Sequence, residues 1–475
     1  MKSISRRNFL RTSGGIAAGT LIIPNFISCS ANSTVNVAVV GVGGRGMDNW
    51  TSMIGVWKDK RRIRLGLDKD EPKQPYPHVR IVAMCDVDDR AAAKAYELIP
   101  QARKYKDFRV MMDEMHKDID AVIVSTPDHT HFAATMAAMQ MGKHVYVEKP
   151  LAHDIWQLRT LKKAADYYGV VTQLGNQGHA SDGIRNIKEW YDQGMLGDIK
   201  EVHAWFSGPD FSSIYFKKPA NYPPIQQTIP DGLDWELWQG PVKARGYSPD
   251  YLPRLWRSYY DLGTGMLGDW GCHTLDAPYW SLDLGSPDVV EPEQIERNSR
   301  MPSQFITDKS ILRFEFPKRG NKPPVTLKWY DGGLKPENRP EWLRKQLPGS
   351  GMIMVGDKMS AMTGGKPWDA HLIMPNNEWK DFKENGWEKS IRRIPRESPH
   401  DEFIDAIRGY GPKPGSNFAY GADLTETVLL GAMAQRFNKR VEFDTANMKV
   451  TNHAELNNFI KEPARKGWQY GEELW

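Results

Sequence analysis

The sequence predicts an α/β protein, with a doubly wound parallel sheet in its N-terminal part and an α+β domain with an open, largely antiparallel sheet after it. Short apolar, β-branched runs alternate with helical stretches in the first part, which is the order that builds a parallel sheet. Glycines directly follow the first of these runs. Later strand-like runs suggest the open sheet of the second domain. The 475 residues suit two such domains.

The first element is an export signal, residues 1–33. Twin arginines, Arg6 and Arg7, precede a short apolar stretch over residues 16–23. This order is typical of a Tat-type signal peptide, and the stretch is much shorter than the ~20 residues that cross a bilayer as a helix. An amphipathic first helix is the alternative, which the glycine pair before the apolar stretch disfavours. We therefore expect a periplasmic protein.

Cys29 adds a second outcome of export. The residues Phe26-Ile-Ser-Cys29 resemble a bacterial lipoprotein cleavage box, in which the cysteine becomes the lipidated first residue. The mature protein is then either free in the periplasm or anchored to the membrane by a lipid on Cys29. Only Cys85 and Cys272 remain, with no Cys-x-x-Cys motif, so neither a disulfide framework nor a Cys-rich zinc site is available.

The net charge argues against nucleic acid as a partner. The whole chain carries +4, but residues 1–31 hold four Lys or Arg and no acid, so the mature chain is neutral. Binding phosphate backbones needs a surplus of Lys and Arg on one face. We therefore expect a small-molecule ligand and no nucleic acid.

The run from Val35 to Val40 predicts the first buried strand. It ends in a G-x-G-x-x-G motif, in which the first glycine permits a tight turn, the second lets the backbone approach a pyrophosphate, and the third allows a helix to pack on the strand. The N-terminus of that helix supplies N-H groups for the phosphates. A plain tight turn is the alternative. The motif contains Gly41, Gly43, Gly44, Arg45 and Gly46.

The second strand, residues 80–86, ends in Asp86. An acid there can accept hydrogen bonds from the ribose hydroxyls of the adenosine, and its charge repels a 2′-phosphate, which favours NAD over NADP. Asp86 follows Gly41 by 45 residues, whereas the fingerprint has about 20. The charged, proline-containing stretch over residues 57–77 predicts an inserted loop that accounts for most of the difference.

Two further apolar strands, residues 121–124 and 144–147, are separated by a predicted helix over residues 132–141. Ligands of a doubly wound sheet bind at the carboxyl ends of its strands, so the residues after each strand are candidates for binding the cofactor. These residues are Ser125, Thr126, Pro127 and His131 after the first of the two strands, and Glu148, Lys149 and Pro150 after the second.

Together these motifs resemble the Gfo/Idh/MocA oxidoreductases, the family of glucose-fructose oxidoreductase and inositol dehydrogenase. Glu-Lys-Pro after the fifth strand is the most specific element, and the resemblance covers essentially the whole mature chain. It implies an NAD(P)-binding Rossmann domain over residues 34–150 and a substrate-binding, catalytic domain over residues 151–475. It also implies that a nicotinamide cofactor is contacted by the glycine motif, by Asp86 and by the residues after the two later strands.

After Pro150 the pattern predicts a helix over residues 156–168 and a sixth strand over residues 170–174. The turn after this strand contains Asn176 and His179. In the resembled family this turn lies over the nicotinamide, which implies that Asn176 binds the cofactor and that His179 is near the substrate. A glycine turn carrying a solvated histidine is the alternative.

A second group of candidates lies in a glycine-rich stretch and in a predicted helix from Leu267. Asp269 and His273 are i and i+4 in that helix and share one face, with Asp276 one step further. A carboxylate beside a histidine makes a reasonable acid-base pair, although such a spacing is also common in surface pairs. The resemblance implies that Asp269 and His273 form a catalytic triad with Lys149.

The stretch over residues 209–259 is rich in Pro, Tyr and Trp. Its aromatic rings can stack on sugars, or they can simply anchor a long loop. We take Arg257 from this stretch, with His179 and Asp276, as the candidate substrate-binding residues. A zinc site formed by His179, Asp276 and the acid and histidine of the predicted helix is an alternative that their spacing does not support, and we expect no metal.

The remaining pattern completes the second domain. Helical periodicity and alternating runs predict further helices and strands, the strands belonging to the open sheet. The predicted helices are 184–193, 398–407 and 424–437, and the predicted strands are 199–207, 310–316 and 324–330.

We therefore expect a nicotinamide-dependent oxidoreductase that acts on a sugar, polyol or glycoside, with NAD held tightly and recycled because free NAD is scarce outside the cytoplasm. In this hypothesis His273 takes the hydroxyl proton, Lys149 polarises the same oxygen, and Asp269 positions the substrate and His273. An NAD-dependent glycoside-cleaving enzyme is the first alternative, and a non-catalytic ligand-binding protein is the second. We also expect a homo-oligomer.

Overall fold

The computed structural model describes residues 34–54 and 78–475. The predicted signal peptide, Cys29 and the predicted loop at residues 57–77 lie outside the described residues, and these expectations stay predictions. Within the described residues, no helix is both long enough and apolar enough to cross a membrane. Cys85 and Cys272 are both free and buried.

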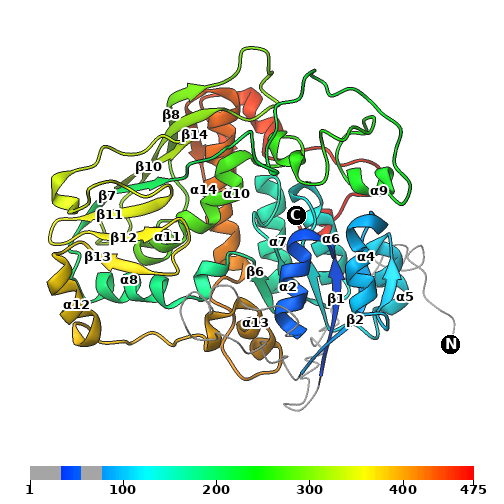
Figure 1. Ribbon diagram of the computed structural model, residues 1–475, viewed down its shortest axis with the longest axis horizontal. Coiled ribbons are helices and arrows are strands. Elements are labelled where there is room, and N and C mark those ends of the chain that lie inside the picture. Colours follow the sequence, from blue (N-terminus) through cyan, green and yellow to red (C-terminus); the bar gives the residue numbers. More distant parts are fainter. Residues whose placement is uncertain (1–33, 55–77) are drawn as a thin grey trace.

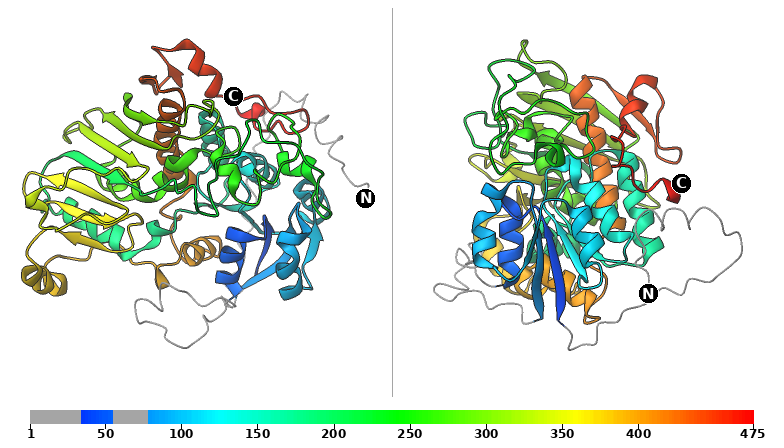
Figure 2. Two further views of the ribbon diagram at one scale, coloured as in Figure 1. Left: turned by 45° about the horizontal axis from the view of Figure 1, so that its top comes forward. Right: turned by 90° about the vertical axis from the view of Figure 1, so that its right-hand side faces the viewer.

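The N-terminal part forms a six-stranded parallel sheet in the order β3-β2-β1-β4-β5-β6. Alternate residues of β1 enter separate apolar cores: Val37 and Val39 lie on one face, and Ala38 and Val40 lie on the other. Helices therefore cover both faces, as Figure 2 shows. The strands are β1 (Val35–Val40), β2 (Val79–Cys85), β3 (Arg103–Tyr105), β4 (Ala121–Val124), β5 (His144–Val147) and β6 (Thr172–Leu174). The helices between them are α2 (Gly44–Ile54), α4 (Asp89–Leu98), α5 (Phe108–Met115), α6 (Asp128–Met139) and α7 (Ile155–Tyr168).

The doubly wound sheet is thus confirmed, and β6 extends it past residue 150, where the sequence analysis ended the first domain. Helix α6 begins four residues earlier than expected, directly after Pro127, because an extended proline serves as its N-cap. Its first turn then points at the carboxyl end of β4.

The C-terminal part contains a nine-stranded sheet in the order β13-β12-β11-β7-β10-β9-β8-β14-β15. Its strand pairs are antiparallel except for β7 and β10, so the expectation of an open, largely antiparallel sheet is confirmed. Figure 1 shows this sheet on the opposite side of the molecule from β1 and β2. The strands are β7 (Ile199–Trp205), β8 (Val289–Glu296), β9 (Lys309–Phe316), β10 (Val325–Asp331), β11 (Gly351–Gly356), β12 (Ala361–Gly364), β13 (Ala370–Leu372), β14 (Val441–Asp444) and β15 (Lys449–Val450).

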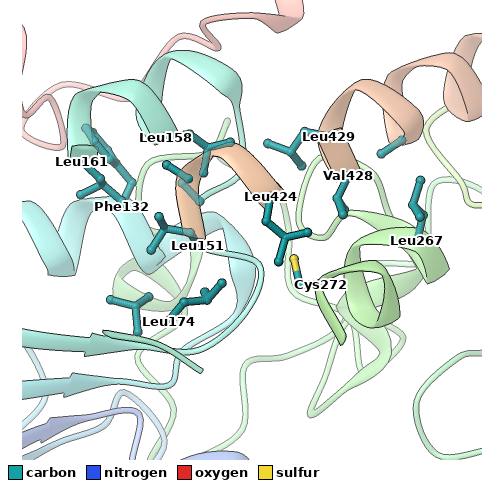
Figure 3. Packing of buried hydrophobic residues seen from close by; sticks show 14 of the residues in the cluster. Phe132, Leu151, Leu158, Leu161, Leu174, Leu267, Cys272, Leu424, Val428 and Leu429 are labelled. Atoms are coloured by element: carbon teal, nitrogen blue, oxygen red, sulfur yellow. The ribbon is translucent and has the colours of Figure 1, made fainter. Parts of the chain in front are cut away.

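Helix α14 (Phe418–Phe437) joins the two sheets. It contacts α7 and β6 on one side and α10, β8 and β9 on the other, and it starts six residues before the predicted helix because Asn417 caps it. Figure 3 shows Leu424 and Val428 of α14 directed toward Cys272 and Leu267 of α10. Because a Cβ on Gly271 would meet Val428 at 2.8 Å, α10 approaches α14 closely and its position is fixed. The other helices of this part are α8 (Asp182–Asp192), α9 (Trp235–Gln239), α10 (Gly265–Thr274), α11 (Asp276–Leu282), α12 (Asn376–Asn385) and α13 (Pro399–Ile407).

A long connection between β7 and α10 returns to the first sheet, as the green chain around α9 shows in Figure 1. Within it, residues 230–240, called the strap below, lie against the end of β2. The N-H of Asp89 donates to Gly232 O at 3.0 Å, and the N-H of Asp234 donates to Val87 O at 2.9 Å. The C-terminal segment holds the strap from outside, since the guanidinium of Arg465 donates to Gly240 O at 2.8 Å. The second domain therefore closes over the first.

Candidate active site

A cavity of about 1210 Å³ lies between the carboxyl ends of the parallel strands, α10 and the long connection. Sites for a single drug-sized ligand are typically about 300–1,000 Å³, so this cavity has room for a dinucleotide and a second molecule. Most of the predicted residues line it. They are Gly41, Gly43, Gly44, Arg45, Asp86, Ser125, Thr126, Pro127, His131, Glu148, Lys149, Arg257, Asp269 and His273.

The glycine motif is a tight turn whose first and last glycines have no room for a side chain. Gly41 has φ of +80°, and a Cβ there would meet Ser125 O at 2.8 Å. A Cβ on Gly46 would meet Gly41 O at 1.8 Å. Gly46 does not line the cavity; it lets α2 approach the turn, which is the packing role that the motif assigns to its third glycine.

Asp86 stabilises the glycine turn directly. Its Oδ2 accepts hydrogen bonds from the N-H groups of Val42 at 2.9 Å and Gly43 at 3.3 Å, and its Oδ1 accepts one from the N-H of Asp88 at 3.1 Å. Burial raises the pKa of Asp86, although these hydrogen bonds oppose the shift. The carboxyl group lies at the end of β2 and faces the cavity, as a ribose-binding acid does.

His131 has no ring nitrogen left for a cofactor. Its Nδ1 lies 2.7 Å from Pro150 O and its Nε2 lies 2.8 Å from Thr126 O. The ring therefore joins the segments that follow β4 and β5. His131 lines the cavity as predicted, and its contact with a cofactor stays a prediction.

Arg45 and Glu148 form an ion pair across the cavity floor, with Nε and Oε1 3.0 Å apart. Glu148 also accepts hydrogen bonds from Asn49 at 3.0 Å and from Gln177 at 3.2 Å. Burial alone would raise the pKa of Glu148, but the charge of Arg45 and these hydrogen bonds lower it below its usual range. Glu148 is therefore ionised. Its contacts with Arg45, Asn49 and Gln177 anchor the chain directly before Lys149.

Lys149 and Asp269 form the central ion pair of the site, with Nζ and Oδ1 2.6 Å apart. The guanidinium of Arg257 donates to the same Oδ1 at 3.2 Å. Burial opposes ionisation, but the two cations lower the pKa of Asp269 to about 2. The predicted side-by-side pairing of Asp269 with His273 is wrong, because Lys149 and Arg257 take the carboxylate.

His273 lies one helical turn after Asp269 in α10, as predicted, and is only 3% exposed. Its Nδ1 is buried and has no hydrogen-bond partner among the described residues. Burial, with repulsion from Lys366, Lys149 and Arg45, holds the pKa of His273 well below its ordinary value. The imidazole is therefore neutral at neutral pH and is available to accept a proton.

Asn176, His179 and Asp276 do not line the cavity, which corrects three predicted site residues. A 3-10 helix (Gln177–Ala180) turns the chain inward after β6, so His179 Nδ1 lies 2.9 Å from Asp276 Oδ1 in the interior. The hydroxyl of Tyr420 donates to the same Oδ1 at 2.6 Å. Asn176 Oδ1 accepts a hydrogen bond from Ser416 at 2.6 Å. These side chains form a buried polar cluster behind the site.

The same geometry contradicts the zinc alternative. His179 and Asp276 are in that buried cluster, whereas Asp269 is neutralised by Lys149 and Arg257 in the cavity. In residues 34–54 and 78–475, no group of three or more His, Cys, Asp or Glu side chains is arranged to hold a metal ion.

Sequence reasoning missed several residues that line the reacting end of the cavity. Trp270 stacks on Phe206 with ring centroids 3.9 Å apart. Gln177 bridges Glu148 and Lys366, since its Oε1 accepts a hydrogen bond from Lys366 Nζ at 3.0 Å. Lys366 follows β12 and lies far beyond His273 in the sequence. Only the glycines before it, Gly364 and Gly365, indicate a turn with close packing.

Comparisons with known proteins agree with this geometry. Residues 35–176 match a family model described as "Oxidoreductase family, NAD-binding Rossmann fold", and residues 181–304 match "Oxidoreductase family, C-terminal alpha/beta domain", both of the Gfo/Idh/MocA group. Together the two matches cover more than half of the chain.

Individual relatives match over shorter stretches. The scyllo-inositol 2-dehydrogenase (NADP(+)) of Bacillus subtilis is 37% identical over 277 residues, which are 56% of this chain and 62% of the relative. An alpha-N-acetylgalactosaminidase of Shewanella oneidensis is 26% identical over 225 residues, 43% of this chain and 46% of the relative. The chain spans about half the length of the curated relatives that it matches.

A solved structure shares the fold. The inositol dehydrogenase homologue of Azotobacter vinelandii, complexed with NADH and myo-inositol, aligns with a TM-score of 0.55 at 16% identity. The alignment covers 88% of this chain and 100% of that chain.

Proposed function

This chain belongs to the Gfo/Idh/MocA oxidoreductases, and we propose that it transfers hydride between a carbinol carbon of a sugar, polyol or glycoside and a nicotinamide dinucleotide. The proposal depends on one observation: Lys149, Asp269 and His273 converge at one end of a cavity that has the glycine turn in its wall. The cavity is large enough for both reactants.

The residues present fit a dinucleotide. The turn at Gly41 to Gly43 leads into α2, which begins at Gly44, and the backbone N-H groups of its first turn can bind a pyrophosphate. We propose NAD rather than NADP, because the carboxyl groups of Asp86 and Asp88 both line the cavity at the end of β2. Arg90 cannot readily serve a 2′-phosphate, since it pairs with Asp88 at 2.7 Å.

When bound, the nicotinamide supplies hydride acceptance and donation; the chain's own residues handle the proton and the substrate. Neutral His273 accepts the hydroxyl proton, and the ammonium group of Lys149 donates a hydrogen bond to the same oxygen as charge develops on it. Asp269 is a positioning residue, because its carboxylate fixes Lys149 and Arg257 at the reacting end. This replaces the expectation that Asp269 orients His273.

We propose that the cofactor is held tightly and recycled within the protein. The strap and the C-terminal segment support this, because Leu237 and Trp238 of the strap and Trp468 of the C-terminal segment line the same cavity as the glycine turn. We propose that these contacts slow the release of a dinucleotide. A cofactor retained in this way suits our further proposals that the chain is exported through a Tat-type signal, with or without a lipid on Cys29, and that it works as a homo-oligomer in the periplasm.

Glycoside cleavage is the second candidate function, and similarity to a protein named alpha-N-acetylgalactosaminidase favours it. The same residues would serve, since transient oxidation of a sugar acidifies the adjacent C-H bond and permits loss of the glycosidic substituent as an alcohol. Water then adds to the resulting double bond, and return of the hydride completes a net hydrolysis. Release of nitrophenol from a nitrophenyl glycoside without added NAD would separate this outcome from net oxidation.

The proposed function is tested by purifying the full chain without added nucleotide and denaturing it. We expect NAD or NADH in near-stoichiometric amount, and we expect one or more members of a sugar and polyol panel to change the nicotinamide absorbance of the native protein. Protein that carries no nucleotide and binds NAD only at millimolar concentration contradicts the proposal of a tightly held cofactor; the absence of any change across the panel contradicts the oxidoreductase itself.

A further inference from the structure

Lys366 is a cavity-lining amine that has no carboxylate partner among the residues that the structure describes. The other cations at the reacting end are neutralised: Arg45 pairs with Glu148, and Lys149 and Arg257 share Asp269. In contrast, Lys366 Nζ donates to the neutral Oε1 of Gln177 and forms no ion pair with any carboxylate of the described residues. A buried or half-buried charge normally has a counter-ion.

The backbone around Lys366 is held rigidly. The hydroxyl of Thr274 in α10 donates to Gly365 O at 2.9 Å, and the hydroxyl of Ser181 donates to Pro367 O at 2.6 Å. Pro367 also packs closely on Gly178, where a Cβ would meet the proline ring at 2.5 Å. Lys366 is therefore held from both sides, as a residue that binds a ligand group needs to be.

The charges around Lys366 make this end of the cavity electropositive. Burial and repulsion from Arg45 and Lys149 lower the pKa of Lys366 to about 7, against a weaker pull from Glu148 and Asp269. The pKa of His273 is lowered by burial and by the nearby charges of Lys366, Lys149 and Arg45. An anion placed against Lys366 would relieve this repulsion and would strengthen His273 as a proton acceptor.

We propose that Lys366 binds an anionic substituent of the substrate, a carboxylate or a phosphate, so that the substrates are acidic sugars or their glycosides rather than neutral ones. The inference rests on the proposed function for the identity of the sugar, but the anion site itself is a property of Lys366 and its neighbours. Gln177 orients the ammonium group, and Trp270 and Trp368 lie beside it, with ring centroids 5.8 Å and 5.2 Å from Nζ. These rings also provide a signal for binding.

The test compares matched ligands on the full chain as purified. D-Glucuronate and D-glucuronamide differ in the charge of one group, D-glucose 6-phosphate distinguishes phosphate from carboxylate, and the galactose counterparts extend the panel. Binding is followed by tryptophan fluorescence in the wild type, in Lys366→Gln and Lys366→Arg, and in Lys200→Gln as an exposed control from β7. Hydrogen bonds to a charged group lead us to expect an anion preference of about tenfold or more in the wild type and in the control.

We expect this preference to disappear in Lys366→Gln and to persist in part in Lys366→Arg. Equal affinity of the wild type for acid and amide, a preference that survives Lys366→Gln, or failure of every anionic probe to bind would overturn the inference. A second measurement needs no variant: in protein with isotopically labelled lysines, the NMR titration of Lys366 should move to higher pH when the acid binds and should stay in place with the amide.

Failure of this inference and failure of the proposed function give different results. Hydride transfer from neutral sugars together with no anion preference rejects the anion site and retains the oxidoreductase. A Lys366-dependent anion preference without hydride transfer from any bound sugar retains the anion site and rejects the oxidoreductase.

Discussion

The ammonium group of Lys149 lies 2.6 Å from Asp269 Oδ1 and also donates to the backbone carbonyl of Asp269. The two residues are 120 positions apart: Lys149 follows the end of strand β5, and Asp269 lies in α10. This contact connects the parallel sheet to the helix that carries His273. This partly buried ion pair, reinforced by Arg257, is therefore one of the contacts that join the two domains, together with those of α14.

We expect Asp269→Asn to lower both activity and stability. Removing one partner of this partly buried ion pair leaves the other charge uncompensated, at a cost below the about 3–5 kcal/mol of a fully buried pair. The change also frees Lys149 from its position. Denaturant unfolding and turnover of the variant are compared with Asp192→Asn, which removes a surface partner of Lys188. If both variants unfold at the wild-type denaturant concentration, the central role of this ion pair is wrong.

His273→Ala should cut turnover by about 10²-fold or more, as loss of a general base does, while the bound nucleotide stays. Because the pKa of His273 is held well below its ordinary value, the acidic limb of the wild-type pH profile should lie below about pH 6.5. Turnover and nucleotide content are measured on the same preparations. An acidic limb at the ordinary histidine pKa that vanishes in the variant would contradict the electrostatic account of the site.

Gly46→Ala should lose bound nucleotide and stability together. Its Cβ would fall 1.8 Å from Gly41 O, so the turn or α2 must shift. Gly349→Ala is the matched control, because its nearest side-chain neighbour would be 3.9 Å away. Nucleotide content after gel filtration and the thermal midpoint are the two readouts. Full retention of nucleotide by Gly46→Ala would show that the third glycine is dispensable.

The stability of the domain junction should fall as pH rises. Burial alone would lower the pKa of His153, but the carboxylate of Glu462, 3.0 Å away, raises this pKa to about 9. The protonated ring therefore stabilises the fold fully below about pH 6.5, and this contribution, about 3 kcal/mol, is lost as the pH rises through about 9.

Asp154 acts in the same direction at lower pH, because burial raises its pKa to about 7 and its ionisation is disfavoured in the folded state. Urea unfolding of the wild type, His153→Gln and the exposed control His116→Gln, each followed from pH 6 to about 9, tests this account. If the free energy of unfolding depends on pH in the same way in the wild type and in His153→Gln, protonated His153 does not stabilise the fold.

Arg465→Ala should speed loss of the nucleotide without changing the chemistry. Arg465 does not line the cavity; it donates to Gly240 O and lies 2.6 Å from Glu236, so it holds the strap closed. We expect about a tenfold faster release, consistent with the loss of a charge-assisted hydrogen bond. The exposed neighbour Lys466→Ala is the control. If Arg465→Ala releases the nucleotide at the wild-type rate, the strap does not contribute to tight binding of the nucleotide.

Elements with a strong local pattern could be predicted from the sequence. Strands β1, β4 and β5 lie at the predicted residues because their apolar runs are bounded by glycine, proline or charged residues. The pair of Asp269 and His273 on one helix followed from spacing alone. The beginnings of α6 and α14 were missed, since each depends on a cap, Pro127 or Asn417, rather than on apolar periodicity.

The partners of the site residues could not be predicted, because they come from segments far apart in sequence. Asp269 binds Lys149 instead of its neighbour His273, and His179 is withdrawn to Asp276 by a short 3-10 helix. Lys366 has no motif around it; its place beside His273 depends on packing of the β12 turn against α10. Spacing determines which residues share a helix face, but tertiary packing determines which charges meet.

The most direct test is deuterium transfer from substrate to the nucleotide that we expect to co-purify with the protein. The full chain is incubated, without added NAD, with sugars and sugar acids deuterated at their carbinol carbons. The nucleotide is then extracted, and its mass is measured by mass spectrometry. We predict a nicotinamide dinucleotide that gains one deuterium with at least one substrate and gains none in His273→Ala. Nucleotide that stays unlabelled with every substrate, or protein that holds none, would contradict the central claim.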